Sequence, residues 1–397
     1  MPELDEFAEA LIAQMAVEIS EEKEIAKLTS KINEDADFTL KFDAIEQISE
    51  QLLPELKQKA SEFLGIPVSA EIKLQFPELK DFKKLKGKKV FCVDDTREYV
   101  DDLFIAVANE DLKKIVELIK QDTAKFLVYS TYAKMYISKI STTYGDYLND
   151  VIYLNKFILS SYPQIILYKQ GTPYESNYEN VKAGYLGALK MTILEEIIHS
   201  VQQNLQKINK EAVIQVNSIN EELAKIILNL DEKTATELSE YLKIQPVPDD
   251  FPIAKRANLF FILNPDHFII EQLGPDVMTY THVEIDPKIS EFVPELLDIY
   301  KKWLTPIQIH HAAFTVMEGM AEFSIHKILN NDQDFKNYLT TFMGTDISSY
   351  QVRKSIGMDF IQVVFEKLSK PTFKTVIENP PYTKELKEPQ LYLKRIQ

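Results

Sequence analysis

The chain has 397 residues, 45% of them apolar, and a formal net charge of −16 at pH 7. So acidic a chain repels phosphate backbones, and we expect no nucleic-acid partner. The single cysteine, Cys92, excludes an intrachain disulfide and a cysteine-based metal site, and the absence of any run of about 18 apolar residues argues against a membrane span. Because the acidic N-terminus does not resemble a secretory signal, we predict a cytoplasmic protein.

The first half of the chain mixes helical and strand-like patterns. Apolar residues at helical spacing predict helices within residues 3–64, interrupted by the polar stretch 33–37, and an amphipathic helix at 110–120. Alternating or short apolar runs predict four strands. These strands are expected at residues 69–76, 88–94, 151–154 and 164–169.

The second half is predicted to be almost entirely helical, with an irregular, proline-broken tail after residue 371. The expected helices cover residues 180–205, two segments within 221–243, residues 289–304 around Pro294, 306–329 and 348–368.

Composition and pattern together predict a helix-rich α+β fold. The chain has only 10 glycines, against a usual share of roughly 7%, which disfavours an architecture built from tight hairpins. We expect three parts: an N-terminal helical region at 1–66, a lobe at 67–250 that carries the strands and the long helix, and a helical C-terminal lobe at 251–397.

The helix predicted at 180–205 contains the segment I-L-E-E-I-I-H-S-V-Q, residues 193–202. Glu195 and His199 are one turn apart, so they lie on the same face, about 40° from each other. The helix is otherwise apolar nearly all round, which predicts that it is buried. Buried ionisable groups need a proton, a partner or a cation, and we therefore expect Glu195, Glu196 and His199 to belong to a functional site.

A second polar line follows the helix predicted at 306–329. His311, Glu318 and Glu322 share one face among apolar side chains. Gly319 lies beside them and has no side chain, which predicts a close approach by another helix or backbone.

The two segments E-E-I-I-H-S-V-Q and M-E-G-M-A-E-F together resemble the gluzincin class of zinc metallopeptidases, whose members carry H-E-x-x-H and a later Glu-Gly. The resemblance covers roughly residues 150–385. It implies a zincin-like core, with a small sheet packed on the helix that carries the motif.

The resemblance also implies roles for individual residues. Glu195, His199 and Glu318 would hold one divalent metal, zinc before manganese or iron, and Glu196 would be the general base for water attack on a peptide or protein carbonyl. Glu322 would support the ligands without touching the metal, and His311 is assigned the same role from its place on the helix face. No residue is assigned to an organic cofactor.

The chain departs from the gluzincin pattern at Glu195, which occupies the position of the first histidine. Zinc accepts a carboxylate ligand, but the added negative charge moves the preference toward manganese or iron. With Glu196, Glu318 and Glu322 nearby, four carboxylates exceed the charge of one divalent ion. Without a metal, the cluster needs protons or Lys or Arg counter-ions.

Three hypotheses follow from these residues. The first is a metal-dependent hydrolase, and the second is a zincin-like protein that has lost catalysis and serves binding or scaffolding. The third is a carboxylate-bridged di-iron or di-manganese protein, because Glu196-x-x-His199 is the E-x-x-H unit of that class. A second such unit is missing, since Glu322 and His326 are one residue too far apart. The sequence does not give the oligomeric state.

Overall fold

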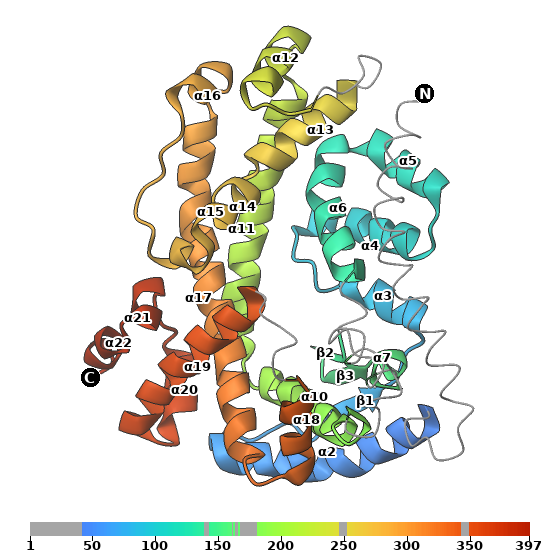
Figure 1. Ribbon diagram of the computed structural model, residues 1–397, viewed down its shortest axis with the longest axis vertical. Coiled ribbons are helices and arrows are strands. Elements are labelled where there is room, and N and C mark those ends of the chain that lie inside the picture. Colours follow the sequence, from blue (N-terminus) through green and yellow to red (C-terminus); the bar gives the residue numbers. More distant parts are fainter. Residues whose placement is uncertain are drawn as a thin grey trace. The chain divides into compact units, whose positions relative to one another are not determined.

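A computed structural model describes residues 42–138, 143–160, 162, 166, 181–245, 252–342 and 349–397 (Figure 1). Its helices and strands are, in chain order, α2 (Phe42–Leu64), β1 (Lys73–Gln75), α3 (Leu79–Gly87), α4 (Asp94–Ala108), α5 (Leu112–Gln121), α6 (Thr123–Ser138), β2 (Gly145–Leu148), β3 (Val151–Leu154), α7 (Lys156–Ser160), α10 (Tyr185–Ser200), α11 (Gln203–Leu228), α12 (Glu232–Tyr241), α13 (Pro252–Leu263), α14 (Pro265–Phe268), α15 (Ile270–Leu273), the 3₁₀ helix η2 (Gly274–Thr279), α16 (Pro287–Phe292), α17 (Leu296–Ile328), α18 (Gln333–Phe342), α19 (Ser349–Leu368), α20 (Pro371–Glu378), α21 (Thr383–Lys387) and α22 (Pro389–Arg395). The predicted helix-rich α+β class is confirmed.

The chain folds into two compact units, each assembled from segments that are distant in sequence. Unit 1 contains Lys83–Ser138 and Ile208–His311. Within the described residues, unit 2 contains 42–82, 143–207 and Ala312–Gln397. The three-part division expected from the sequence follows chain order and stays a prediction.

A three-stranded sheet lies in unit 2, in the order β1-β3-β2. β1 is parallel to β3, with Leu74 opposite Ile152, and β2 is antiparallel to β3. The sheet packs on α10, which contacts both β2 and β3 (Figure 1). The approach is close, because a Cβ atom on Gly145 of β2 would lie 2.7 Å from Cγ2 of Thr192 on α10.

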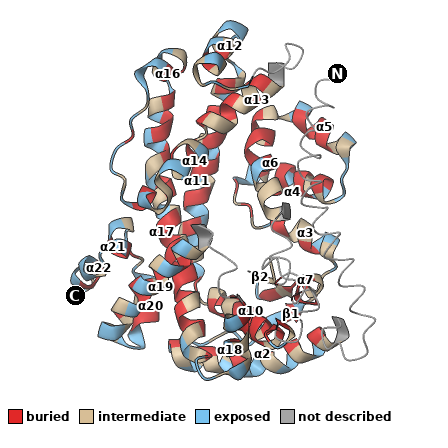
Figure 2. Cartoon of the chain, viewed as in Figure 1, coloured by how far each residue is buried: buried red, intermediate tan, exposed pale blue. Residues whose placement is uncertain are grey.

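α10 is buried along most of its length, as a helix that is apolar nearly all round predicts (Figure 2). α10 also packs against α18. The contact is so close that a Cβ on Gly187 would lie 2.1 Å from the carbonyl oxygen of Asp334. Lys190, one turn later on α10, pairs with both Asp332 and Asp334 at 2.7 Å. The sheet and α18 therefore fix the helix that carries the E-E-x-x-H motif.

Unit 1 buries polar side chains in complementary pairs, which is how a core accommodates them. The Tyr129 hydroxyl donates to Glu221 at 2.8 Å, and Nε1 of Trp303 donates to Asp266 at 2.8 Å. Burial raises the pKa of Asp266, although hydrogen bonds from Asn220 and Trp303 act in the opposite direction. These pairs give the carboxylates of Glu221 and Asp266 hydrogen-bond donors within unit 1.

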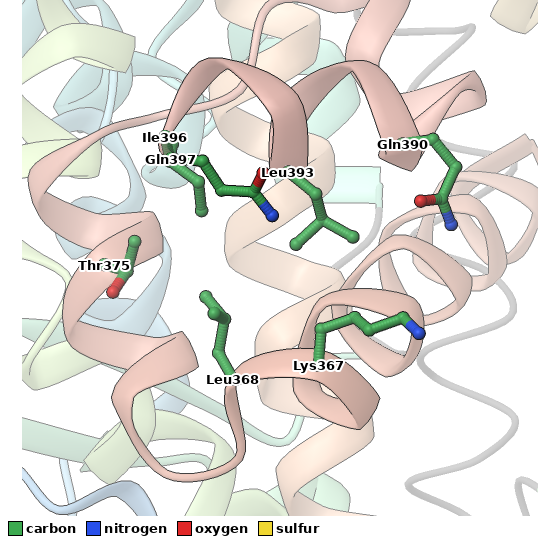
Figure 3. A pocket seen from close by; sticks show the side chains of 7 residues that line it. All are labelled: Lys367, Leu368, Thr375, Gln390, Leu393, Ile396 and Gln397. Atoms are coloured by element: carbon green, nitrogen blue, oxygen red, sulfur yellow. The ribbon is translucent and has the colours of Figure 1, made fainter.

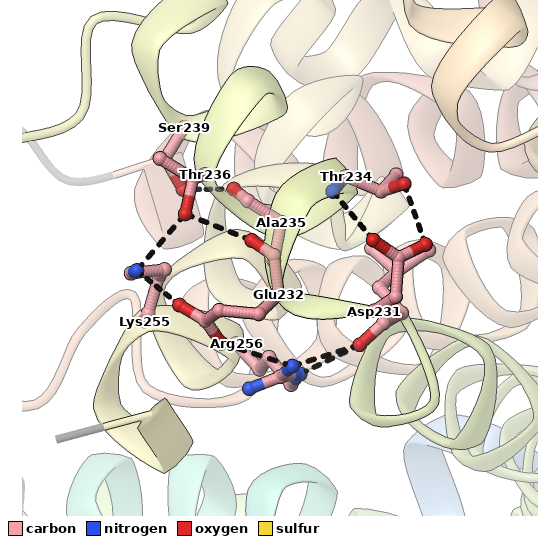
Figure 4. Close-up of polar contacts among 9 residues, drawn as sticks. Asp231, Glu232, Thr234, Ala235, Thr236, Ser239, Lys255 and Arg256 are labelled. Carbon is pink, nitrogen blue, oxygen red and sulfur yellow. Dashed lines mark hydrogen bonds and ion pairs between the residues drawn. The ribbon is translucent and has the colours of Figure 1, made fainter. Parts of the chain in front are cut away.

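A second polar cluster joins α12 to α13 (Figure 4). Asp231 caps α12 by accepting a hydrogen bond from the backbone N–H of Thr234 at 2.9 Å. Glu232, in the first turn, pairs with Lys255 and Arg256 of α13. The cluster is half exposed at Glu232, and it is typical of a structural helix–helix contact.

Two of the predicted strands are observed and one is wrong. β1 and β3 lie within the expected ranges 69–76 and 151–154. Residues 88–94 do not form a strand. The chain turns after α3, with the N–H of Val90 bonded to the carbonyl of Gly87, and α4 begins at Asp94. The sequence analysis missed β2, whose partner β3 is reached by a tight turn.

The predicted helices are largely present, with different ends. The segment 180–205 is not one helix, because α10 ends at Ser200 and α11 begins at Gln203 and continues to Leu228. Pro306 does not end α17, which runs from Leu296. The tail is not irregular but forms α20, α21 and α22, since Pro371 and Pro389 occupy first turns, where a missing N–H is not needed.

Two predictions fall outside the described residues. These are the strand at 164–169, of which only Ile166 is described, and the helices before residue 42. Among the described helices, none combines the length and apolar character that a membrane crossing requires.

Candidate metal centre

Three side chains singled out from the sequence meet in unit 2. Glu195 and His199 come from α10 and Glu318 from α17, and one potential ligand atom of each lies within 4.8 Å of the other two. Nε2 of His199 is 3.6 Å from Oε1 of Glu318. Two segments 123 residues apart, counted from Glu195 to Glu318, thus supply one group of donors.

The imidazole of His199 is held in a defined orientation by Gln202. Nε2 of Gln202 donates to the backbone carbonyl of Met317 at 3.0 Å. A carbonyl only accepts, so the amide oxygen of Gln202 must face Nδ1 of His199, 2.8 Å away. Nδ1 therefore carries hydrogen and donates, which leaves Nε2 facing Glu318 as the position for a proton or a metal.

A buried lysine of α19 lies among the carboxylates. Nζ of Lys354 is 2.5 Å from Oε1 of Glu195, 3.8 Å from Oε2 of Glu318 and 3.6 Å from Oε2 of Glu322. Its side chain is 8% exposed, as is that of Glu318. Such a contact offsets part of the cost of burying these charges.

Glu322 has two basic neighbours. Besides Lys354, Nε2 of His326 lies 3.1 Å from its Oε1 atom. Burial alone would raise the pKa of Glu322, but the hydrogen bond from His326 and the charge of Lys354 lower it below its usual value. Glu322 is therefore ionised at neutral pH.

The surroundings of His199 favour a positive charge. Burial alone would lower the pKa of its imidazole, but the carboxylate of Glu318 and, less strongly, those of Glu196 and Glu195 raise it. The same negative field that attracts a proton to Nε2 attracts a metal cation. A metal at Nε2 must displace that proton.

The remaining predicted residues are placed differently. Glu196 is buried and outside the group of three donors, although its charge acts on His199. His311 is buried in unit 1 and is not part of the group, and its ring lies 5.1 Å from that of His310. The predicted role of His311 as a support for the ligands stays a prediction.

Two glycines bring Lys354 to the site. A Cβ on Gly319 of α17 would lie 2.0 Å from the carbonyl carbon of Gly357, and a Cβ on Gly357 would lie 2.0 Å from the carbonyl oxygen of Thr315. α17 and α19 therefore cross backbone to backbone, one residue after Glu318 and three residues after Lys354. This confirms the close approach that Gly319 predicts.

The donor set fits a divalent ion. Zinc–ligand bonds of about 2.0–2.2 Å place neighbouring ligand atoms roughly 3.3–3.6 Å apart, so the three donors need to close by no more than about 1.5 Å. One imidazole and two carboxylates suit zinc, manganese or iron(II). The carboxylates of Glu195, Glu318 and Glu322 all face the ammonium of Lys354, so negative charge is concentrated here. A divalent cation adds positive charge to this cluster.

Lys354 and the orienting role of Gln202 are not evident from the sequence. The one local signal is Gly357, three residues after Lys354, which indicates a close approach of α19 to another backbone. The bond of Gln202 to Met317 depends on a contact between segments that are 115 residues apart. The need for a Lys or Arg counter-ion was predicted without identifying the residue.

A cavity of about 350 Å³ lies elsewhere in unit 2, between the ends of α19, α20 and α22 (Figure 3). Its lining includes Lys367, Thr375 and Gln390 and none of the residues of the candidate metal centre. Its mixture of flexible polar and aliphatic side chains presents no convergent catalytic groups.

No family model, curated protein or solved structure matches the chain. The resemblance to gluzincins stays a prediction from the two sequence motifs.

Proposed function

We propose that the chain is a metal-dependent hydrolase with a zincin-like core, in which Glu195, His199 and Glu318 bind one divalent ion. The observation that carries this proposal is the meeting of these three donors from α10 and α17. The orientation of His199 supports this proposal, because Nδ1 donates a hydrogen bond to Gln202 and Nε2 faces Glu318. This is the arrangement that metal-binding histidines usually have.

The chain's own residues then divide the chemistry among them. A divalent ion would supply Lewis acidity to a water molecule and to a substrate carbonyl. Glu196 accepts the proton of the attacking water as general base, since it is buried beside the ligands and outside the ligand group. The substrate class is a peptide or another amide.

Replacing Glu196 by Gln tests this assignment. The amide keeps the size of the side chain but does not accept the proton, so hydrolysis of a fluorescence-quenched peptide library should fall about 10²–10⁴-fold. The metal content should stay that of the unchanged protein. Glu378→Gln on α20, where the carboxylate pairs only loosely with Lys374 at 3.7 Å, is the matched control and should retain full activity.

Two results would contradict the proposal. One is the absence of hydrolysis by the unchanged chain with zinc, manganese and iron(II) each supplied in turn. The other is equal activity of the Glu196→Gln variant.

Lys354 supports a second candidate, a zincin-like protein that has lost catalysis and serves binding. Its ammonium already supplies a cation to Glu195, Glu318 and Glu322, so the cluster has a counter-ion without a metal. Metal content separates the candidates, because a metal-free protein of full stability fits only the second. A two-metal centre lacks support, since the described residues hold a single group of three or more clustered donors.

A further inference from the structure

Lys354 has an unusual environment for a lysine. The residue as a whole is 6% exposed, and its Nζ faces three carboxylates from two other helices. Burying an ammonium is costly unless carboxylates compensate it, and removing one partner of such a cluster leaves an unbalanced charge. The residue is therefore bound to this cluster by charge and not by packing alone.

The contacts of Glu318 show how an ammonium and a metal can share the cluster. Its Oε1 atom faces Nε2 of His199, and its Oε2 atom faces Nζ of Lys354. The two oxygens of one carboxylate thus point at different positive groups. Lys354 does not need the oxygen that a metal beside His199 would take.

We propose that Lys354 is a built-in counter-cation of this centre, a positioning residue that acts in two ways. Its ammonium holds Glu195, Glu318 and Glu322 together while no divalent ion is bound. It also repels a divalent ion and so weakens its binding. This inference rests on the proposed function, because it assigns Lys354 a role toward the same ion.

The proposal has a physical alternative, in which Lys354 only fills space below the crossing of α17 and α19. The charge role and the packing role of Lys354 predict different effects when Glu322 is substituted together with Lys354. If charge decides, removing the ammonium leaves excess negative charge, which removing the carboxylate of Glu322 relieves in part. If packing decides, the two substitutions add their losses.

The experiment uses the full chain after chelation, in four variants: Lys354→Met, Glu322→Gln, the double variant, and Lys190→Met as control. Lys190 also bridges two carboxylates in unit 2 but lies outside the centre. Thermal unfolding is recorded without metal, and Mn²⁺ binding is measured by calorimetry.

We expect Lys354→Met to lower the metal-free Tm by about 5 °C. Glu322→Gln should restore part of that loss. Mn²⁺ should bind Lys354→Met about tenfold more tightly than the unchanged chain, because a repelling charge is gone. Lys190→Met should lower the Tm and leave the Mn²⁺ affinity unchanged. Should Lys354→Met not fold without metal, the double variant is compared with Glu322→Gln, and the same tenfold tightening is expected.

The outcomes separate this inference from the proposed function. If Mn²⁺ binds the Lys354→Met variant but not the unchanged chain, the inference stands and the proposed function fails. If both bind Mn²⁺ equally, the inference is overturned and the function stands. The inference is also overturned if neither Lys354→Met nor the unchanged chain binds Mn²⁺, or if the Tm losses of Lys354→Met and Glu322→Gln add in the double variant.

Discussion

Gly319 has no side chain to act in the candidate metal centre, yet replacing it by Ala should displace Lys354 from that centre. The new Cβ would lie 2.0 Å from the carbonyl carbon of Gly357 and 2.4 Å from the backbone nitrogen of Met358. Both contacts are with backbone, so no side chain can turn aside. α19 must move away from α17, and Lys354 moves with it.

The size of the effect follows from these distances. Ordinary contact begins at 3.4 Å, so the backbones must separate by about 1.4 Å at the crossing. Overpacking of this kind costs typically 1–3 kcal/mol, at the upper end where backbone is involved. Alanine has a helix propensity about 1 kcal/mol better than glycine. We therefore expect a net loss of roughly 2 kcal/mol in the free energy of unfolding.

Urea unfolding of the full chain measures this loss. Gly274→Ala is the control, because its added Cβ meets nothing within 4 Å and only the positive φ of 51° opposes it. That variant should lose about 1 kcal/mol from backbone strain. The reasoning is refuted if Gly319→Ala is as stable as the unchanged protein, since helix propensity alone would then decide.

Two further substitutions test the frame around the centre. Gln202→Leu removes the acceptor that orients His199 and should weaken zinc binding about 10–100-fold by calorimetry, whereas an unchanged affinity would remove Gln202 from the argument. Lys190→Met should cost about 1–2 kcal/mol at pH 7 in urea unfolding. Burial alone would raise the pKa of Asp332, but the hydrogen bond from Lys190 lowers it below its usual value. The stability that the Lys190–Asp332 pair contributes is therefore present above the ordinary aspartate pKa of about 3.9, and it is lost as the pH falls through the lowered pKa. Burial alone would lower the pKa of Lys190, yet its two aspartates raise it, so its contribution is lost only as the pH rises through the raised value. The difference between variant and unchanged chain should thus be constant from about pH 5 to 9 and shrink in acid, and a difference that grows in acid would contradict the pairing.

Local patterns in the sequence predict the parts of this centre that depend on one helix. Helical spacing places Glu195 and His199 on one face, and the apolar surroundings predict that most of their helix is buried. Gly319 predicts a close helix crossing, and Gly357 provides it. These inferences succeed because the i, i+4 geometry of a helix and the absence of a side chain act over a few residues.

The parts that depend on contacts between distant segments could not be predicted. Lys354 is 159 residues from Glu195, and nothing in its own segment indicates which carboxylates it meets. His311 shares a helix face with Glu318 but lies two turns earlier, in unit 1, and its supporting role stays a prediction. A shared face gives direction around a helix and ignores distance along it.

The wrong element predictions have the same origin. Residues 88–94 carry the short apolar run of a strand, yet no strand among the described residues pairs with them, and the chain instead turns between α3 and α4. The prolines of the tail suggest irregular chain, but a proline in a first helical turn costs little. Strand formation needs a neighbour, and the sequence does not name it.

Metal content is the most direct test of the claim that Glu195, His199 and Glu318 bind one ion. The full chain is purified without added metal and analysed for zinc, manganese and iron, together with His199→Ala and His267→Ala. His267 is an exposed histidine paired with Glu271 and serves as the control. We predict about one divalent ion per chain in the unchanged protein and in His267→Ala, and loss of that ion in His199→Ala. A fully stable unchanged protein that is free of all three metals, or equal metal content in both variants, would contradict the claim.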